Sequence, residues 1–171
     1  MAETIELAGA TAAAHDHHAG RLGAFAEAHA AMTAARAAGT AITVDTPLTR
    51  SSYRGLGELP VALIALGVAR WRLRVVAAET IAADARPRTI PRLAMALPHA
   101  LHAAARARGL GLPTVIVDAP TCLLGPYAAH AERTAPRAYA APCMRCTLRG
   151  GCAGVDAAYL EQFGAGELAP R

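Results

Sequence analysis

Three of the four cysteines in this chain, Cys143, Cys146 and Cys152, lie within ten residues, and the fourth is Cys122. Their spacing is C-x20-C-x2-C-x5-C, and no cysteine is left over. Four thiolates are the ligand set of one iron–sulfur cluster or of one structural zinc ion. The close pair Cys143 and Cys146 can supply two ligands from a single turn. The sequence therefore predicts a metal or iron–sulfur centre.

Glycines follow the cysteine pair and would let the backbone curl back to deliver the last ligand. They are Gly150, Gly151 and Gly154.

Alternative chemistries for the same thiols stay open. Zinc sites of four cysteines usually pair two short C-x-x-C turns, whereas only Cys143 and Cys146 form one here, so an iron–sulfur centre is preferred and zinc is the alternative. Thiol redox catalysis at this pair is a third reading, although nothing places the pair between a strand and a helix. A fourth is that the chain is the inactive product of a truncated gene.

The composition narrows the class of protein. The chain has 171 residues, 54% of them hydrophobic but only 4% aromatic, which predicts one domain with an aliphatic core. The net charge is +4 without a basic run, so no nucleic-acid partner is expected. No apolar run is long enough to span a bilayer, and the acidic N-terminus lacks the pattern of a secretory signal. We expect a cytoplasmic protein whose cysteines are ligands and not disulfides.

Hydrophobic periodicity predicts helices and strands in alternation. Helices are expected over residues 20–38, from about 52 to 66, over 89–108 and over 156–163, and strands over 41–45, 71–76 and 114–118. This alternation predicts an α/β fold, a half βα barrel of about three parallel strands with flanking helices, followed by a loop-rich cysteine region. The expected divisions are an N-terminal loop over 1–19, the half-barrel over 20–121 and the cluster region over 122–171.

The predicted fold brings some polar residues to one rim. The carboxyl ends of parallel strands gather at one edge of a sheet, where ligands bind, and Cys122 follows a strand directly. The run from His15 to His18 could supply metal ligands, but the favoured interpretation is an exposed polar loop, because no cysteine or carboxylate pattern completes a site nearby. The tail from Gly164 to Arg171 is expected to fray.

These residues resemble a known family, the radical S-adenosylmethionine enzymes. The likeness is to the second half of their partial (β/α)6 barrel with a SPASM-like auxiliary iron–sulfur region, over roughly residues 16–170. It rests on Gly23-Ala24-Phe25, Thr46-Pro47-Leu48-Thr49-Arg50, residues 66–73, residues 120–126, and the C-x2-C-x5-C run with Gly154 and Tyr159. The family's catalytic C-x3-C-x2-C motif has no counterpart in this chain.

The resemblance implies a role for each group of residues. The four cysteines, Cys122, Cys143, Cys146 and Cys152, would hold one auxiliary [4Fe–4S] cluster. Thr49, Arg50 and Ser51 would face S-adenosylmethionine, shared with a partner that supplies the catalytic cluster, so the chain would not be active alone. An open sheet has two unpaired edge strands, which a protein partner or self-association would cover.

Overall fold

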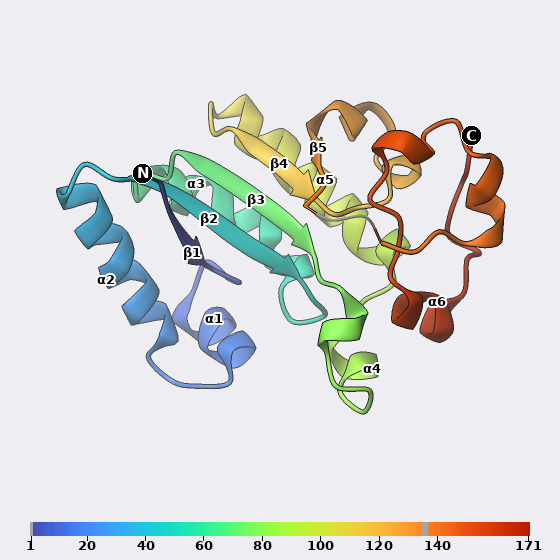
Figure 1. The fold of residues 1–171 in the computed structure, drawn as a ribbon. Helices are drawn as coiled ribbons and strands as arrows, with labels where there is room; N and C mark the ends of the chain where they lie inside the picture. Colours follow the sequence, from blue (N-terminus) through green and yellow to red (C-terminus); the bar gives the residue numbers. More distant parts are fainter. Residues whose placement is uncertain (1, 135–136) are drawn as a thin grey trace.

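A parallel sheet of five strands organises the molecule, which we describe from a computed structural model over residues 2–134 and 137–171 (Figure 1). All neighbouring strands are parallel, and their order in the sheet is their order in the chain. The strands are β1 Ala2–Glu6, β2 Ala41–Leu48, β3 Arg70–Val75, β4 Thr114–Val117 and β5 Ala131–Glu132. Sequential order is the arrangement of a βα-barrel segment, whereas a doubly wound sheet reverses its order midway.

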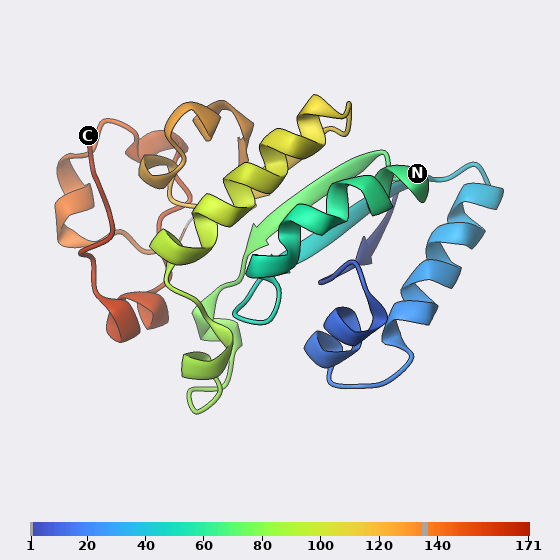
Figure 2. The same ribbon diagram turned by 180° about the vertical axis from the view of Figure 1, so that it is seen from behind.

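Helices cover one face of this sheet. The α-helices are α1 Ala12–Ala19, α2 Ala24–Ala37, α3 Leu59–Ala65, α4 Arg86–Thr89, α5 Leu93–Gly109 and α6 Ala157–Phe163. Figure 2 shows α3 and α5 lying across the face that is hidden in Figure 1. In this covered layer Trp71 is fully buried, and its indole Nε1 donates to Thr46 Oγ1 at 2.8 Å. Thr46 Oγ1 in turn donates to the Leu7 carbonyl oxygen at 2.7 Å, so the one tryptophan packs without an unpaired indole N–H.

The opposite face of the sheet is open and charged. Strand residues point alternately to the two faces, so the neighbours of Trp71 and Leu73 point away from the helices. Arg74 contacts Asp45 at 3.1 Å and Glu6 at 3.3 Å across the strands. Arg72 continues this network to Asp45 at 3.5 Å. In Figure 1 no helix of the described chain lies across this face.

The structure confirms the α/β class and three predicted strands, and it adds two. Residues 41–48, 70–75 and 114–117 are the middle strands of the sheet. The expected helix over 89–108 divides into α4 and the longer α5, and Pro98 lies inside α5 without ending it. The predicted last helix is α6, and Asp156 caps it by accepting a hydrogen bond from the Tyr159 N–H at 2.9 Å.

The expected N-terminal loop is wrong. Residues 2–6 form edge strand β1, paired in parallel with β2, and residues 12–19 form helix α1. The hydrophobic pattern of these residues was weak because β1 buries only Ile5 and α1 buries only His15. Each element is short and exposed on most sides, so hydrophobic periodicity could not reveal it. The two-residue β5 was also beyond the reach of a periodicity argument.

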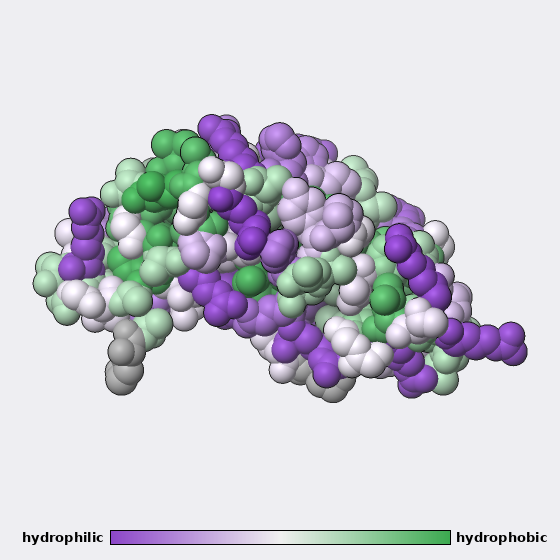
Figure 3. Space-filling model, turned by 90° about the horizontal axis from the view of Figure 1, so that it is seen from above, coloured by the Kyte–Doolittle hydropathy of each residue, from purple (hydrophilic) through white to green (hydrophobic). Residues whose placement is uncertain are grey.

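The C-terminal region beyond β4 is mostly turns. In the described part of this region, 3₁₀ turns span Thr121–Leu123, Gly125–His130, Ala141–Arg145 and Arg149–Gly151. Figure 3, a view from above, shows a larger group of hydrophobic residues at the left and a smaller one at the right, with hydrophilic residues between them. None of the helices in the described residues has the length and apolarity needed to cross a membrane.

Candidate metal centre

Cys122 lies shortly after β4, at the edge of the sheet where the carboxyl ends of the strands meet. Asp118 follows β4 with a left-handed backbone (φ 58°) and a buried side chain, which turns the chain sharply. Its carboxylate accepts hydrogen bonds from the Thr134 N–H at 2.8 Å and Thr134 Oγ1 at 2.6 Å. Arg137 also donates to it, at 3.4 Å. Asp118 therefore fixes the start of the cysteine region to the sheet, and Cys122 follows in the turn Thr121–Leu123.

Two tight turns present the other three cysteines. The Cys146 N–H donates to the Cys143 carbonyl at 3.1 Å, which closes one 3₁₀ turn around both residues. Cys152 comes directly after the next turn and is buried. Of the three glycines expected to bend this segment, only Gly154 has a positive φ, 74°. A Cβ at that position would collide with the Ala138 carbonyl oxygen, so this close approach requires glycine.

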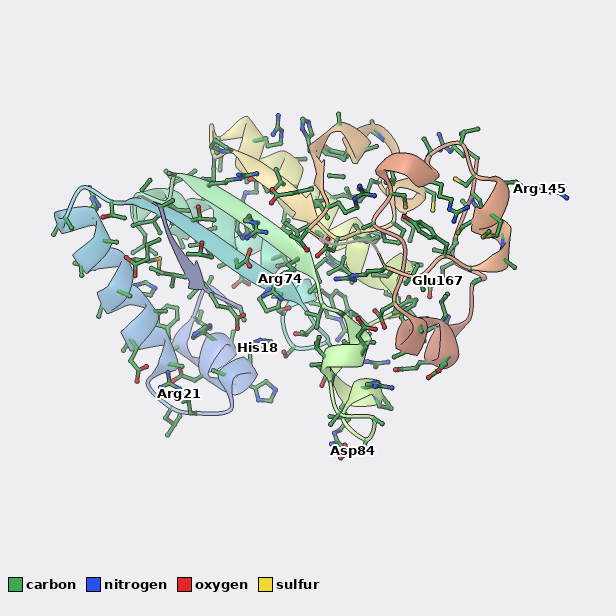
Figure 4. All side chains as sticks on the ribbon, viewed as in Figure 1. His18, Arg21, Arg74, Asp84, Arg145 and Glu167 are labelled. Atoms are coloured by element: carbon green, nitrogen blue, oxygen red, sulfur yellow. The ribbon has the colours of Figure 1, made fainter. Side chains whose placement is uncertain are left out.

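All four cysteines line one cavity. Its volume is about 20 Å³, and its wall also includes Pro120, Tyr139, Leu148, Arg149, Leu168 and Pro170. All four thiols are free, without a disulfide among them. Figure 4 shows sulfur atoms gathered among the C-terminal loops, with Arg145 projecting outward beside them. The structure thus brings Cys122, which 20 residues separate from Cys143, to the same cavity as the three clustered cysteines.

Backbone amides surround the thiols. Sγ of Cys152 accepts from the Thr121 N–H at 3.4 Å and from the Gly154 N–H at 3.3 Å. Sγ of Cys146 accepts from the Arg171 N–H at 3.4 Å. The pKa of the Cys122 thiol is raised overall, because burial and the three other thiols outweigh the lowering effect of a hydrogen bond from the Ala169 backbone. N–H groups directed at sulfur would stabilise the negative charge of a bound iron–sulfur cluster.

The tail closes one side of this cavity, contrary to the expected fraying. Leu168 and Pro170 line the cavity, and the Arg171 carbonyl accepts from Thr147 Oγ1 at 2.9 Å. Glu167 anchors the tail to α5, because its carboxylate accepts from the Ala94 N–H at 2.6 Å. Figure 4 shows Glu167 inside the fold, below the loops that carry the sulfur atoms. Tertiary contacts order a segment that lacks periodicity of its own.

Within the described residues, no three His, Cys, Asp or Glu side chains are grouped so as to hold a single metal ion. All four cysteines are nevertheless among the residues that line the cavity. No family model matches this chain, and no curated protein is significantly similar to it. The case for a metal centre therefore rests on the chain's own sequence and geometry.

The three residues expected to face S-adenosylmethionine also lie at the carboxyl rim, after β2. Thr49 is buried, whereas Arg50 and Ser51 are exposed. Thr49 Oγ1 lies 3.0 Å from Ser51 Oγ, and His18 Nδ1 lies 3.0 Å from the same Ser51 oxygen. Arg50 Nε donates to the Ile90 carbonyl at 3.2 Å. The two hydroxyls already share a hydrogen-bond network with a histidine.

The histidine run does not form one site. His15 is buried in α1, and its Nδ1 accepts from the Ala8 N–H at 3.0 Å. Asp16 accepts from the Gly23 and Phe25 amides, both at 2.8 Å, and thereby caps the start of α2. His17 is exposed. His18 faces the rim, where its Nε2 lies 3.7 Å from Glu6, and burial lowers its pKa. The expected polar loop is a helix whose polar residues have separate structural roles.

Sequence reasoning missed several residues of the two rim regions. Tyr139 donates to the Cys152 carbonyl at 2.9 Å, and its ring lies under Arg149, with the guanidinium 5.0 Å from the ring centroid. The roles of Glu6 and Glu167 were not predicted either, because each contacts a residue that lies far from it in the sequence. The only signal for Glu167 was its place within residues 16–170, the stretch that resembles the family.

Proposed function

We propose that this protein binds one [4Fe–4S] cluster through Cys122, Cys143, Cys146 and Cys152. The observation that carries the proposal is the cavity with all four cysteines in its wall, at the carboxyl rim of a parallel sheet. Four cysteine thiolates are the usual ligands of such a cluster, one for each iron, so the iron sites would all be occupied by protein. A fully ligated cluster favours electron transfer over direct binding of substrate to iron.

The surroundings of the sulfurs support a cluster over a single zinc ion. Sulfur ligands of a cluster stand farther apart than those of one zinc ion, and within the described residues no three of these thiols are grouped so as to hold a single ion. N–H to sulfur bonds, such as those from Thr121 and Gly154, tune the potential of iron–sulfur proteins. Arg149 in the wall offsets the negative charge that four thiolates bring. Zinc remains the second candidate, since the same four thiolates suit it.

The proposal includes a partner. The resemblance to radical S-adenosylmethionine enzymes suggests that a second protein supplies the catalytic cluster and that S-adenosylmethionine is shared near Thr49, Arg50 and Ser51. The uncovered sheet face and edge strand β1 support association, because open edges of parallel sheets are normally covered. In this view the chain is an electron-transfer component that is inactive alone.

Anaerobic purification with metal and sulfide analysis tests the cluster. We expect about four iron and four sulfide per chain and a brown protein with broad absorption near about 400 nm. Cys122→Ser and Cys152→Ser should each lose most of the iron. Met144→Ser, an exposed change between Cys143 and Cys146, is the matched control and should retain it. Zinc bound without iron would replace the proposal with the structural alternative.

Size-exclusion chromatography and co-purification test the partner. We expect self-association or capture of a protein that carries a C-x3-C-x2-C motif. A stable monomer that captures no such protein would remove the partner from the proposal and leave the cluster intact.

A further inference from the structure

A second cavity at the same rim gathers arginines. It has a volume of about 50 Å³ and is lined by Arg50, Tyr53, Arg54, Pro91, Arg92 and Met95. Arg50 and Arg54 come from the segment after β2, and Arg92 directly precedes α5. No acidic residue is among those that line it. The carboxyl rim of a parallel sheet is where ligands of such folds bind.

Each of the three guanidinium groups is held in place. Arg50 Nε donates to the Ile90 carbonyl at 3.2 Å, while its backbone N–H donates to Thr89 at 2.9 Å. The Arg54 guanidinium stacks 4.9 Å from the centroid of the Tyr53 ring. Arg92 lies 5.0 Å from the Phe163 ring centroid in the same manner. Guanidinium groups held in this way lose little side-chain entropy when a ligand binds.

The charge of this cavity is unbalanced. Arg92 forms an ion pair with Glu167 at 3.3 Å. Across the residues that the structure describes, Arg50 and Arg54 form no ion pair with a carboxylate. Two uncompensated positive charges beside a third guanidinium repel one another and favour an anion between them. A dianion would balance the charge of Arg50 and Arg54.

The remaining wall suits an organic group. Tyr53 is buried and forms the apolar floor under Arg54, while half of Met95 is exposed (50%) at the cavity. A ligand with an anionic head and an apolar or planar body would use both parts of the wall. Guanidinium groups match phosphate oxygens through paired hydrogen bonds, and a tetrahedral phosphate offers oxygens to several of them at once.

We propose that Arg50, Arg54 and Arg92 bind the phosphate group of a small organic phosphate. The site uses none of the four cysteines, so its test does not depend on whether the chain binds a cluster. It assigns Arg50, which the resemblance would place near S-adenosylmethionine, to a second ligand at this rim, whereas Thr49 and Ser51 line no part of this cavity.

Calorimetric titration of the full chain tests this site, with phenyl phosphate and inorganic phosphate as probes. We expect phenyl phosphate to bind more tightly than inorganic phosphate, and both to weaken as salt is raised. Arg50→Gln and Arg54→Gln should each weaken phenyl phosphate binding by roughly tenfold or more, because each loses charge-assisted hydrogen bonds. Arg54→Lys keeps the positive charge but lacks the planar guanidinium. Its affinity for phenyl phosphate should lie between that of the unmodified chain and that of Arg54→Gln.

Matched controls separate this site from general charge effects. Arg36→Gln removes one exposed arginine on α2, away from the cavity, and should leave the affinity unchanged. Equal weakening by Arg36→Gln, or no binding of phenyl phosphate to the unmodified chain, would overturn the proposal. Succinate binding as tightly as phenyl phosphate would overturn the assignment to phosphate. Cys122→Ser should lose iron and keep phosphate affinity, so this site and the cluster fail separately.

Discussion

The Gly154 backbone N–H donates to Sγ of Cys152 at 3.3 Å, and it does so from a left-handed conformation with φ of 74°. Gly154→Ala forces a Cβ against the Ala138 carbonyl and strains the backbone, which costs about 1–2 kcal/mol before any loss of the sulfur contact. We expect lower iron content and a lower melting temperature. Gly150→Ala, where an added Cβ meets nothing and φ is not positive, should leave both unchanged.

The tail provides a second test of the cysteine cavity. Ala169→Pro removes the backbone N–H that bonds to Cys122, whereas Ala169→Gly keeps it. Loss of an N–H to sulfur bond destabilises the reduced, more negative cluster, so we expect a lower reduction potential for Ala169→Pro. Its cluster should also bleach faster in air. Redox titration and the decay of absorbance near about 400 nm measure these effects. Identical behaviour of the proline and glycine variants would show that the tail does not contact the cluster.

Glu167 links the tail to the start of α5. Its carboxylate is 9% exposed and accepts from the Ala94 N–H and from Tyr159 Oη, the latter at 2.8 Å. Burial and the bond to Glu167 raise the pKa of Tyr159, so its hydroxyl stays protonated and donates. Glu167→Ala should lower the free energy of unfolding by about 2 kcal/mol, because it leaves a helix N–H and a buried hydroxyl without their acceptor. Urea denaturation measures this change in the free energy of unfolding. Glu161→Ala, on the exposed side of α6, should cost much less.

His15 makes stability depend on pH. Burial, and then the nearby His18, lower its pKa below the ordinary value of 6.5. The unfolded chain takes up this proton near pH 6.5, and the folded chain only at lower pH. Between these two values the unfolded state binds more protons, so the free energy of unfolding falls as the pH drops below about 6.5.

Urea denaturation at several pH values between 7.5 and 5.5 checks the prediction. His15→Asn keeps an acceptor for the Ala8 N–H and should reduce the slope by up to about 1.4 kcal/mol per pH unit. His17→Asn changes an exposed histidine of the same helix and should preserve the slope. A slope unaltered in His15→Asn would mean that other groups, such as His18, cause the dependence.

Local pattern was sufficient for the elements that bury a continuous face. The strands around Val44, Leu73 and Ile116 and the helix around Leu97 are buried at regular spacing, so periodicity identified them. The cysteine spacing also identified its own turn, because Cys143 and Cys146 are three residues apart and one backbone hydrogen bond closes them. These features depend on residues close in sequence.

Contacts between distant residues were decided by the tertiary structure alone. Strand β1 exists because it pairs with β2, and the tail is ordered because Glu167 meets α5. The same holds for the three arginines of the phosphate cavity, which come from two segments that the sheet brings to one rim. The sequence by itself determined which thiols were available and that Cys122 follows a strand. Only the fold decided that they share one cavity, because the energy of bringing Cys122 to its partners lies in the packing of the whole sheet.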